Sequence, residues 1–182
     1  MTEYTSIVLL CEDRQQEVFA RQFLESCGVD KRRIYPSTCP RGKQAGAQYV
    51  RENYPRHVVS YRQVAHRLSA GLVVLTDADT FETSERLRQL AQALQDSGVP
   101  PRDPRERIGV FIPKRNIETW IYYLQGQAVN EEDVYRHLSK PGDCKPVVRQ
   151  LAQNRRQPLP ENAPNSLKTA CRELPRIFPE EA

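Results

Sequence analysis

The most constraining feature of the sequence is a short apolar run, residues 71–76, that leads directly into the acidic triplet Asp77-Ala78-Asp79. The run reads Gly-Leu-Val-Val-Leu-Thr, which is typical of a strand buried on both faces, as in a parallel sheet. A second run of this kind, residues 6–11, leads into Glu12. The chain therefore carries acidic residues at the ends of two predicted strands.

The spacing of the other apolar residues predicts helices that alternate with strands. Helices are expected at about 14–27, at 46–68 with an interruption near Pro55, at 84–97 and at 117–124, and further strands at about 33–37 and 107–112. Such alternation predicts an α/β fold, an open and mostly parallel sheet of about four strands with helices on both faces. We place this core at residues 1–126. A small helical C-terminal extension, 127–182, is expected to pack on it through short helices near 131–138, 145–154 and 166–174.

Composition limits the class of protein. The chain has 182 residues, of which 38% are hydrophobic and 27% charged, so we expect one soluble domain with a charged surface. No apolar run approaches the length of a membrane span, and the N-terminus lacks the pattern of a secretion signal, so a cytoplasmic protein is expected. The five cysteines include no C-x-x-C pair, which argues against a zinc site. A net charge of +4 permits a polyanionic partner without requiring one.

Ligands of open α/β sheets bind beyond the carboxyl ends of the strands. Three predicted strands deliver acids to that edge: Glu12 follows the first, Asp77 and Asp79 follow the third, and Glu118 comes shortly after the fourth. Carboxylates gathered in this way raise one another's pKa unless a cation neutralises them. Mg²⁺, with Mn²⁺ as an alternative, prefers such oxygen ligands, and it can bind a phosphate and activate an attacking water.

Basic residues near the same edge could supply positive charge for a phosphate group; they are Arg41, Lys43, Lys114 and Arg115. Each acid also has a plain structural interpretation, because an aspartate can cap a helix and Glu118 can favour the dipole of a helix start. Trp120 is interpreted as a core residue. The three histidines His57, His66 and His137 are scattered, and we assign them no chemistry.

The order of strand, Glu12, helix, strand and Asp77-Ala78-Asp79 resembles the Toprim domain shared by topoisomerases, primases and several nucleases. The resemblance covers about residues 5–126. Residues 12–17, Glu-Asp-Arg-Gln-Gln-Glu, are similar to the Glu-Gly-x-x-Asp/Glu stretch of that family. Asp13 replaces the usual glycine, Gln16 stands at the second acidic position, and Glu17 follows one residue later.

The pattern looks closest to small Toprim nucleases of the overcoming-lysogenization-defect type, many of which act in phage defence beside an ATPase. The resemblance implies two-metal hydrolysis of phosphodiester bonds. It implies Glu12, Asp77 and Asp79 as ligands together with Glu17 or Glu118, and a nearby cation such as Lys114 as an assisting group. The chain has no phosphate-loop motif, so an ATPase would be a separate partner.

The leading hypothesis is therefore a metal-dependent nuclease that acts on DNA or RNA. A phosphohydrolase resembling the haloacid-dehalogenase family is an alternative, because it too places Asp-x-Asp after an apolar strand; Asp77 would then be a nucleophile and Glu12 incidental. A third hypothesis is a non-catalytic subunit of Toprim shape that binds nucleic acid. The sequence leaves the oligomeric state open.

Overall fold

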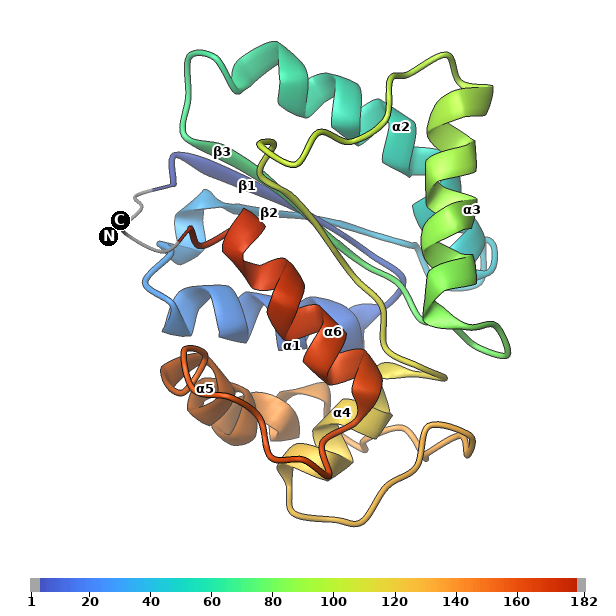
Figure 1. The fold of residues 1–182 in the computed structure, drawn as a ribbon, viewed down its shortest axis with the longest axis vertical. Helices are drawn as coiled ribbons and strands as arrows, with labels where there is room; N and C mark the ends of the chain where they lie inside the picture. Colours follow the sequence, from blue (N-terminus) through green and yellow to red (C-terminus); the bar gives the residue numbers. More distant parts are fainter. Residues whose placement is uncertain (1–3, 180–182) are drawn as a thin grey trace.

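The computed structural model describes residues 4–179, which form a four-stranded sheet with helices on both faces (Figure 1). The strands are β1 (Ser6–Cys11), β2 (Ile34–Thr38), β3 (Ala70–Leu75) and β4 (Ile108–Phe111). They lie in the order β2-β1-β3-β4, and each neighbouring pair is parallel. The predicted α/β fold with an open parallel sheet is confirmed.

Six α-helices and three short 3₁₀ helices connect and cover the strands in the described part of the chain. They are α1 (Arg14–Ser26), η1 (Lys31–Arg33), α2 (Gly46–Val64), α3 (Thr83–Asp96), α4 (Ile117–Leu124), η2 (Pro141–Cys144), α5 (Lys145–Gln153), α6 (Asn165–Glu173) and η3 (Leu174–Arg176). Helices α2 and α3 lie on one side of the sheet, and α1, α5 and α6 lie on the other (Figure 1). Within residues 4–179, every helix is too short or too polar to cross a bilayer.

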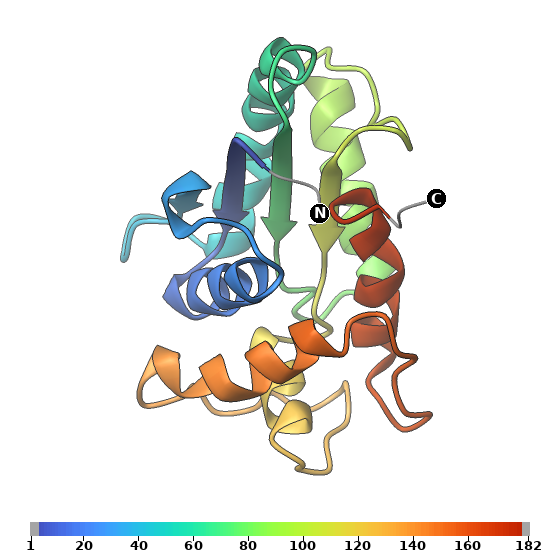
Figure 2. The ribbon, with the colours of Figure 1, turned by 90° about the vertical axis from the view of Figure 1, so that its left-hand side faces the viewer.

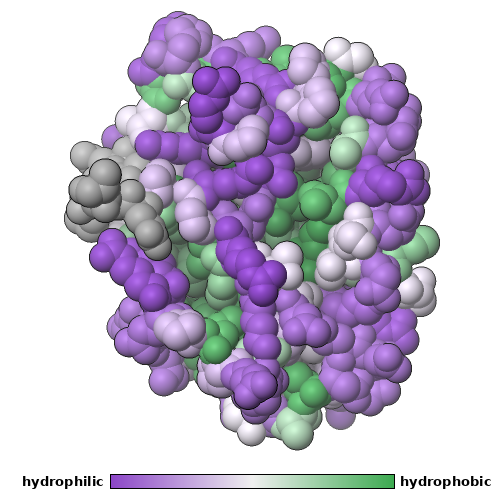
Figure 3. Space-filling view, viewed as in Figure 1, coloured by the Kyte–Doolittle hydropathy of each residue, from purple (hydrophilic) through white to green (hydrophobic). Residues whose placement is uncertain are grey.

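The sheet separates two apolar cores because successive side chains of a strand point to opposite faces. Leu9 and Val73 pack with α1, α4, α5 and α6, whereas Leu10 and Val74 pack with α2 and α3. Trp120 is buried in the first core, as predicted, and its indole N–H donates to Ser166 Oγ at 2.8 Å. Hydrophilic side chains cover most of the face in Figure 3, with smaller apolar areas between them.

Helix α2 differs from the prediction because it continues through Pro55 without interruption. A proline inside a helix removes one backbone hydrogen bond and crowds the preceding turn. In α2, however, Val50, Tyr54 and Val58 recur at four-residue intervals and are buried against the sheet. The packing of this apolar stripe therefore outweighs the cost of the proline.

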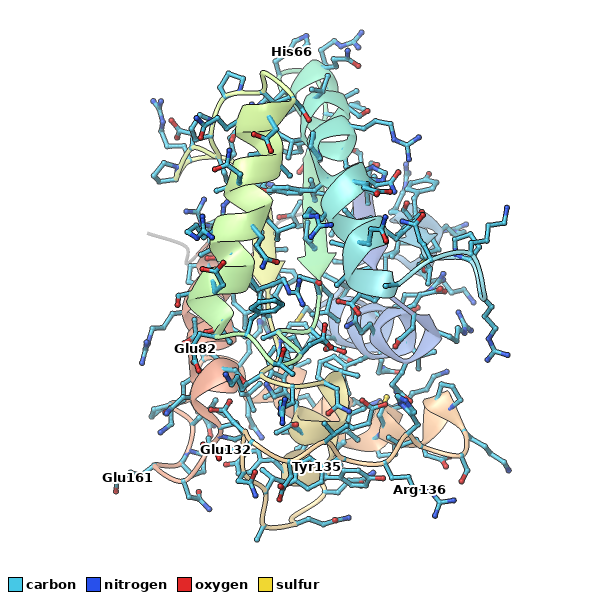
Figure 4. All side chains as sticks on the ribbon, turned by 90° about the vertical axis from the view of Figure 1, so that its right-hand side faces the viewer. His66, Glu82, Glu132, Tyr135, Arg136 and Glu161 are labelled. Atoms are coloured by element: carbon cyan, nitrogen blue, oxygen red, sulfur yellow. The ribbon has the colours of Figure 1, made fainter. Side chains whose placement is uncertain are left out.

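The helix predicted at residues 131–138 is wrong, because this segment is an irregular loop. Asn130 Oδ1 accepts hydrogen bonds from the backbone N–H groups of Glu132, at 2.9 Å, and of Asp133, at 2.7 Å. The Tyr135 hydroxyl accepts the N–H of Asn130 at 2.7 Å. These side-chain bonds satisfy backbone groups that a helix would have used. The loop instead runs beneath the sheet edge, as the positions of Glu132 and Tyr135 in Figure 4 show.

The carboxyl ends of the strands point toward α4, α5 and the loop that joins them (Figure 2). Helix α4 begins six residues after β4 ends and lies across this edge. The first turns of α2 and α3 also start from the loops that leave β2 and β3 here. Segments from most of the chain thus meet at one edge of the sheet.

Candidate active site

Two carboxylates from neighbouring strands meet at this edge. Strands β1 and β3 pair with Cys11 opposite Leu75, so the residues that follow them lie side by side. Glu12 Oε1 accepts a hydrogen bond from the backbone N–H of Asp77 at 2.7 Å and another from the Thr76 hydroxyl. The structure thus brings Glu12 and the aspartate triplet together.

Burial makes the ionised forms of both carboxyls unfavourable. Burial raises the pKa of Glu12 to about 7, although its two hydrogen-bond donors work in the opposite direction. Burial and then the charge of Glu12 hold the pKa of Asp77 well above its usual range, with smaller contributions from Asp13, Glu118 and Asp79. Asp77 is only 6% exposed, and its Oδ1 atom has no hydrogen-bond partner within residues 4–179. A buried acceptor without a donor is a place where a proton or a cation would be stabilised.

Gly46, the first residue of α2, packs directly against Glu12. A Cβ atom at this position would lie 2.5 Å from the Cβ of Glu12 and 3.0 Å from its Oε2. Only glycine therefore lets the start of α2 approach this closely. No side chain of residues 4–179 caps the helix start, and a helix N-terminus carries partial positive charge that favours a nearby anion. The second oxygen of Glu12 thus faces the start of α2.

Asp79 is held by a buried arginine. Its side chain is 54% exposed, and its Oδ2 lies 2.8 Å from Nη2 of Arg86 on α3. The backbone of Asp79 has a φ of +54°, in the left-handed region that residues other than glycine seldom occupy. Its N–H donates to the carbonyl of Arg115 at 3.1 Å, which fixes the turn after β3 to the segment that follows β4.

Glu118 is paired with a histidine that the sequence did not single out. Glu118 lies in the first turn of α4 and is 1% exposed. Its Oε1 is 2.6 Å from Nδ1 of His137, whose side chain is 82% exposed. The hydrogen bond and the charge of Glu118 raise the pKa of His137 above its ordinary value. The loop that replaces the predicted helix therefore places an imidazole, favoured in its cationic form, beside the acids.

Glu17 is bound at the neighbouring strand end. Its carboxylate accepts a hydrogen bond from the Thr38 hydroxyl at 2.8 Å and pairs with the Arg14 guanidinium. The preceding Gln16 bonds the acid site instead, since its Oε1 accepts the N–H of Glu12 at 2.9 Å. The two polar residues at the end of this stretch therefore contact different parts of the site. The Gln16 amide bonds Glu12, and the Glu17 carboxylate bonds Thr38 of β2.

The two basic residues that follow β4 are engaged by other groups. Lys114 Nζ lies 2.8 Å from both the carbonyl of Phe81 and Oε1 of Glu82, at the start of α3. Arg115 donates to the carbonyl of Glu132 and to that of Asp79. Figure 4 shows Glu82 and Glu132 on the two segments that these cations join. Both side chains therefore tie loops of this edge together.

A cleft of about 290 Å³ opens beside Glu12. Its walls come from the loop after β2, from the start of α1 and from the loop before η2; they include Glu12, Asp13, Arg14, Arg41, Glu118 and His137. Arg41 and Lys43 lie on the exposed loop between β2 and α2, and Arg41 lines the cleft. The cleft thus has both acidic and basic residues in its wall, and Lys43 lies on the loop that carries Arg41.

The donor set suits a hard cation such as Mg²⁺. Within residues 4–179, no three His, Cys, Asp or Glu side chains are already grouped as a metal would hold them. Magnesium, however, keeps several waters and needs only one or two carboxylates. Glu12 and Asp77 supply two whose charges interact, and Asp77 Oδ1 lacks a partner among the described residues. The residues therefore fit a cation that these two carboxylates hold together with water.

Comparison of this chain with known protein families, with curated proteins and with solved structures found no match. The interpretation of the site depends on its own geometry.

The site contains four residues that the sequence did not identify: Thr76, Gly46, Arg86 and His137. Thr76 ends the apolar run and directly precedes the triplet, so its position at this edge of the sheet could have been predicted. Gly46 begins the helix predicted at 46–68, but a glycine there does not by itself reveal which side chain packs against it. Arg86 and His137 reach the site through loops and helix turns, and no spacing in the sequence signals such contacts.

Proposed function

We propose that this chain is a metal-dependent nuclease that hydrolyses phosphodiester bonds in DNA or RNA. The observation that carries the proposal is the buried, unpartnered Oδ1 of Asp77 beside Glu12, at the carboxyl edge of a parallel sheet. A half-buried and a buried carboxyl, both with raised pKa values and without a cationic partner among residues 4–179, are typical of functional sites. The resemblance of the strand-acid pattern to Toprim nucleases supports the same activity.

In this proposal Glu12 and Asp77 bind the cation, and Asp79 adds a third carboxylate at the exposed side. Bound Mg²⁺ or Mn²⁺ would supply a Lewis acid for the phosphate and lower the pKa of an attacking water. The Thr76 hydroxyl and the Asp77 N–H fix one oxygen of Glu12, and the other, Oε2, lies beside the start of α2. Burial restricts the Asp77 side chain, and the two donors on Oε1 restrict that of Glu12.

The cleft also favours an anionic substrate at its mouth. Arg41 lines it, and Lys43 lies on the same exposed loop, where both could bind backbone phosphates. His137, whose pKa is raised by its contact with Glu118, adds an imidazole to the wall of the same cleft. In this proposal a nucleic-acid backbone contacts basic and acidic residues of the same cleft. If the activity belongs to phage defence, as in the relatives implied by resemblance, a separate ATPase would be the partner.

The contact between Glu12 and the Asp77 backbone weighs against the phosphohydrolase alternative. That mechanism uses Asp77 as a nucleophile and gives Glu12 no role. Asp77 is 6% exposed, so little of its carboxylate is open to attack a substrate. Glu12 in turn packs against Gly46 and bonds the Asp77 N–H, which gives it a defined place in the site.

The deciding experiment measures cleavage of a panel of single- and double-stranded DNA and RNA with Mg²⁺ or Mn²⁺. We expect cleavage by the wild type, and a loss of more than about 100-fold in Asp77→Ala, because a direct ligand should matter at least as much as the outer partners of a ligand. Asp96→Ala is the matched control, since Asp96 is an exposed aspartate at the end of α3.

The outcomes separate the three hypotheses. Equal cleavage by wild type and Asp77→Ala contradicts the proposed site. A phosphorylated Asp77, trapped while Glu12→Ala keeps full activity, favours the phosphohydrolase. Binding of nucleic acid without cleavage under every metal condition, with a candidate ATPase present as well as absent, favours the non-catalytic subunit.

A further inference from the structure

Arg86 is a buried arginine whose whole guanidinium group is used around the acidic triplet. It lies in the first part of α3 and is 5% exposed. Nε donates to the carbonyl of Asp77 at 2.9 Å, and Nη2 donates to Asp79 Oδ2 at 2.8 Å and to the carbonyl of Ala78 at 3.4 Å. Nη1 donates to Gln89 Oε1 at 2.8 Å. One side chain therefore contacts all three residues of the triplet.

The planar shape of the guanidinium explains why an arginine stands here. Its nitrogens donate in fixed and different directions, whereas a lysine offers one compact ammonium group. The ring of Phe81 lies 5.1 Å from the guanidinium carbon and packs against its face. Burial of a charged group is costly unless its donors are satisfied, and here every nitrogen has an acceptor. These contacts leave Arg86 little freedom to reorient.

The contacts of Arg86 leave particular oxygens unused. Arg86 bonds the carbonyl of Asp77 and leaves its carboxylate alone, so the buried Oδ1 stays without a partner among residues 4–179. On Asp79 it bonds Oδ2, and no bond to Oδ1 is formed in the described part of the chain. Its bonds to the carbonyls of Asp77 and Ala78 hold the two residues that lead into Asp79, whose φ is +54°. Arg86 thus fixes the triplet through its backbone and one carboxylate oxygen.

We propose that Arg86 is a positioning residue, which holds the Asp77–Asp79 turn so that the free oxygens of both aspartates serve one divalent cation. This inference rests on the proposed function, because it assumes a cation at the acid site. It assigns Arg86 no contact with the substrate. Its contribution passes through the aspartates, as outer partners orient the ligands of known metal sites.

The test is calorimetric titration of Mg²⁺ and of Mn²⁺ into the full chain, with its variants, in the absence of nucleic acid. We expect Arg86→Gln to bind the cation about 10- to 100-fold more weakly than wild type, the range seen when outer partners of ligands are removed. The cation affinity of Arg86→Lys should lie between those of the wild type and Arg86→Gln, because lysine keeps the positive charge but lacks the planar set of donors of the guanidinium. Arg88→Gln, on the exposed side of the same helix, should bind as wild type does, since Arg88 pairs only with Glu85 in the described structure.

A double-variant cycle shows whether Arg86 acts through Asp79. If it does, Arg86→Gln should weaken binding less in an Asp79→Asn background than in the wild type. Thermal unfolding of each cation-free variant establishes that it is folded. If Arg86→Gln does not fold, the cation affinity of Arg86→Lys tests the positioning role instead. Wild-type affinity in a folded Arg86 variant overturns the positioning role alone. Absence of cation binding by the wild type overturns both this inference and the proposed metal site.

Discussion

The surroundings of two carboxylate sites in this protein shift the pKa values in opposite directions. Glu106, just before β4, has a side chain that is 19% exposed and pairs with Arg62 on α2. Arg62 Nε lies 2.6 Å from Oε1 and Nη2 lies 3.0 Å from Oε2, while the N–H of Asp103 donates at 2.8 Å. Burial alone would raise the pKa of Glu106, but these donors lower it below its ordinary value.

Among residues 4–179, Glu12 and Asp77 have no such cationic partner. Their pKa values are raised, and Arg86 bonds the carbonyl of Asp77 and the carboxylate of Asp79 instead. The chain therefore has the means to pair a partly buried acid with an arginine and does so at Glu106. The comparison shows that the unpaired acids are confined to one edge of the sheet. Leaving them unpaired lowers the stability of the protein and leaves room for a cation.

The largest stability effect is expected at the paired site. Glu106→Ala should lower the free energy of unfolding by about 3 kcal/mol at neutral pH, because it leaves a partly buried guanidinium without its carboxylate. The value belongs at the low end for such pairs, since Arg62 keeps its bonds to the carbonyls of Pro100 and Pro101. Urea unfolding measures it. Arg105→Ala, which breaks an exposed pair with Asp103, should have no measurable effect, and equal losses in the two variants would remove the contrast.

The opposite sign is expected at the acid site. Glu12→Gln should stabilise the metal-free protein by about 2 kcal/mol at pH 8, because the glutamine keeps Oε1 as an acceptor and removes the buried charge. The pKa of Glu12 is about 7 in the folded protein and has an ordinary value of 4.5. The folded state thus binds more protons between these values, so wild-type stability should fall as the pH rises from 4.5 to 7.

Unfolding curves at several pH values check this prediction. The gain in Glu12→Gln should vanish near pH 4, where the carboxyl is protonated in both folded and unfolded chains. Glu52→Gln is the matched control, because Glu52 is an exposed glutamate on α2 and should show no gain at pH 8. A loss of stability in Glu12→Gln at pH 8 would mean that Glu12 is as well satisfied as Glu106.

The sheet and the meeting of Glu12 with Asp77 could be predicted from the sequence because both follow from regular patterns. An apolar run has the period and length of a buried strand, and parallel strands bring their carboxyl ends to one edge. The bounds of β1 and β3 differ from the predicted runs by at most one residue at either end. The acids that directly follow these strands were therefore placed correctly at the same edge.

The remaining contacts depend on side-chain bonds that leave no periodic signal. His137 reaches Glu118 only because Asn130 and Tyr135 hold residues 131–138 in a loop. Glu17 lies one residue beyond Gln16 on α1, and that rotation alone turns its carboxylate toward Thr38. Lys114, in the loop after β4, bonds Glu82, in the loop before α3. Each contact joins segments whose separation is set by the fold, so residue type and spacing did not determine it.

The smallest expected change in the free energy of unfolding is the one caused by a divalent cation. It tests the contrast between Glu106 and the unpaired acids most directly. At ten times its dissociation constant, Mg²⁺ should raise the free energy of unfolding of the wild type by about 1.4 kcal/mol at pH 8. At pH 5 the gain should be smaller, because protons compete for carboxyls whose pKa values are raised. Glu106→Ala should gain as much from Mg²⁺ as the wild type, whereas Glu12→Gln should gain less. Equal gains in both variants would show that Mg²⁺ acts elsewhere on the protein, and the unpaired acids would then be a cost to stability without a cation to relieve it.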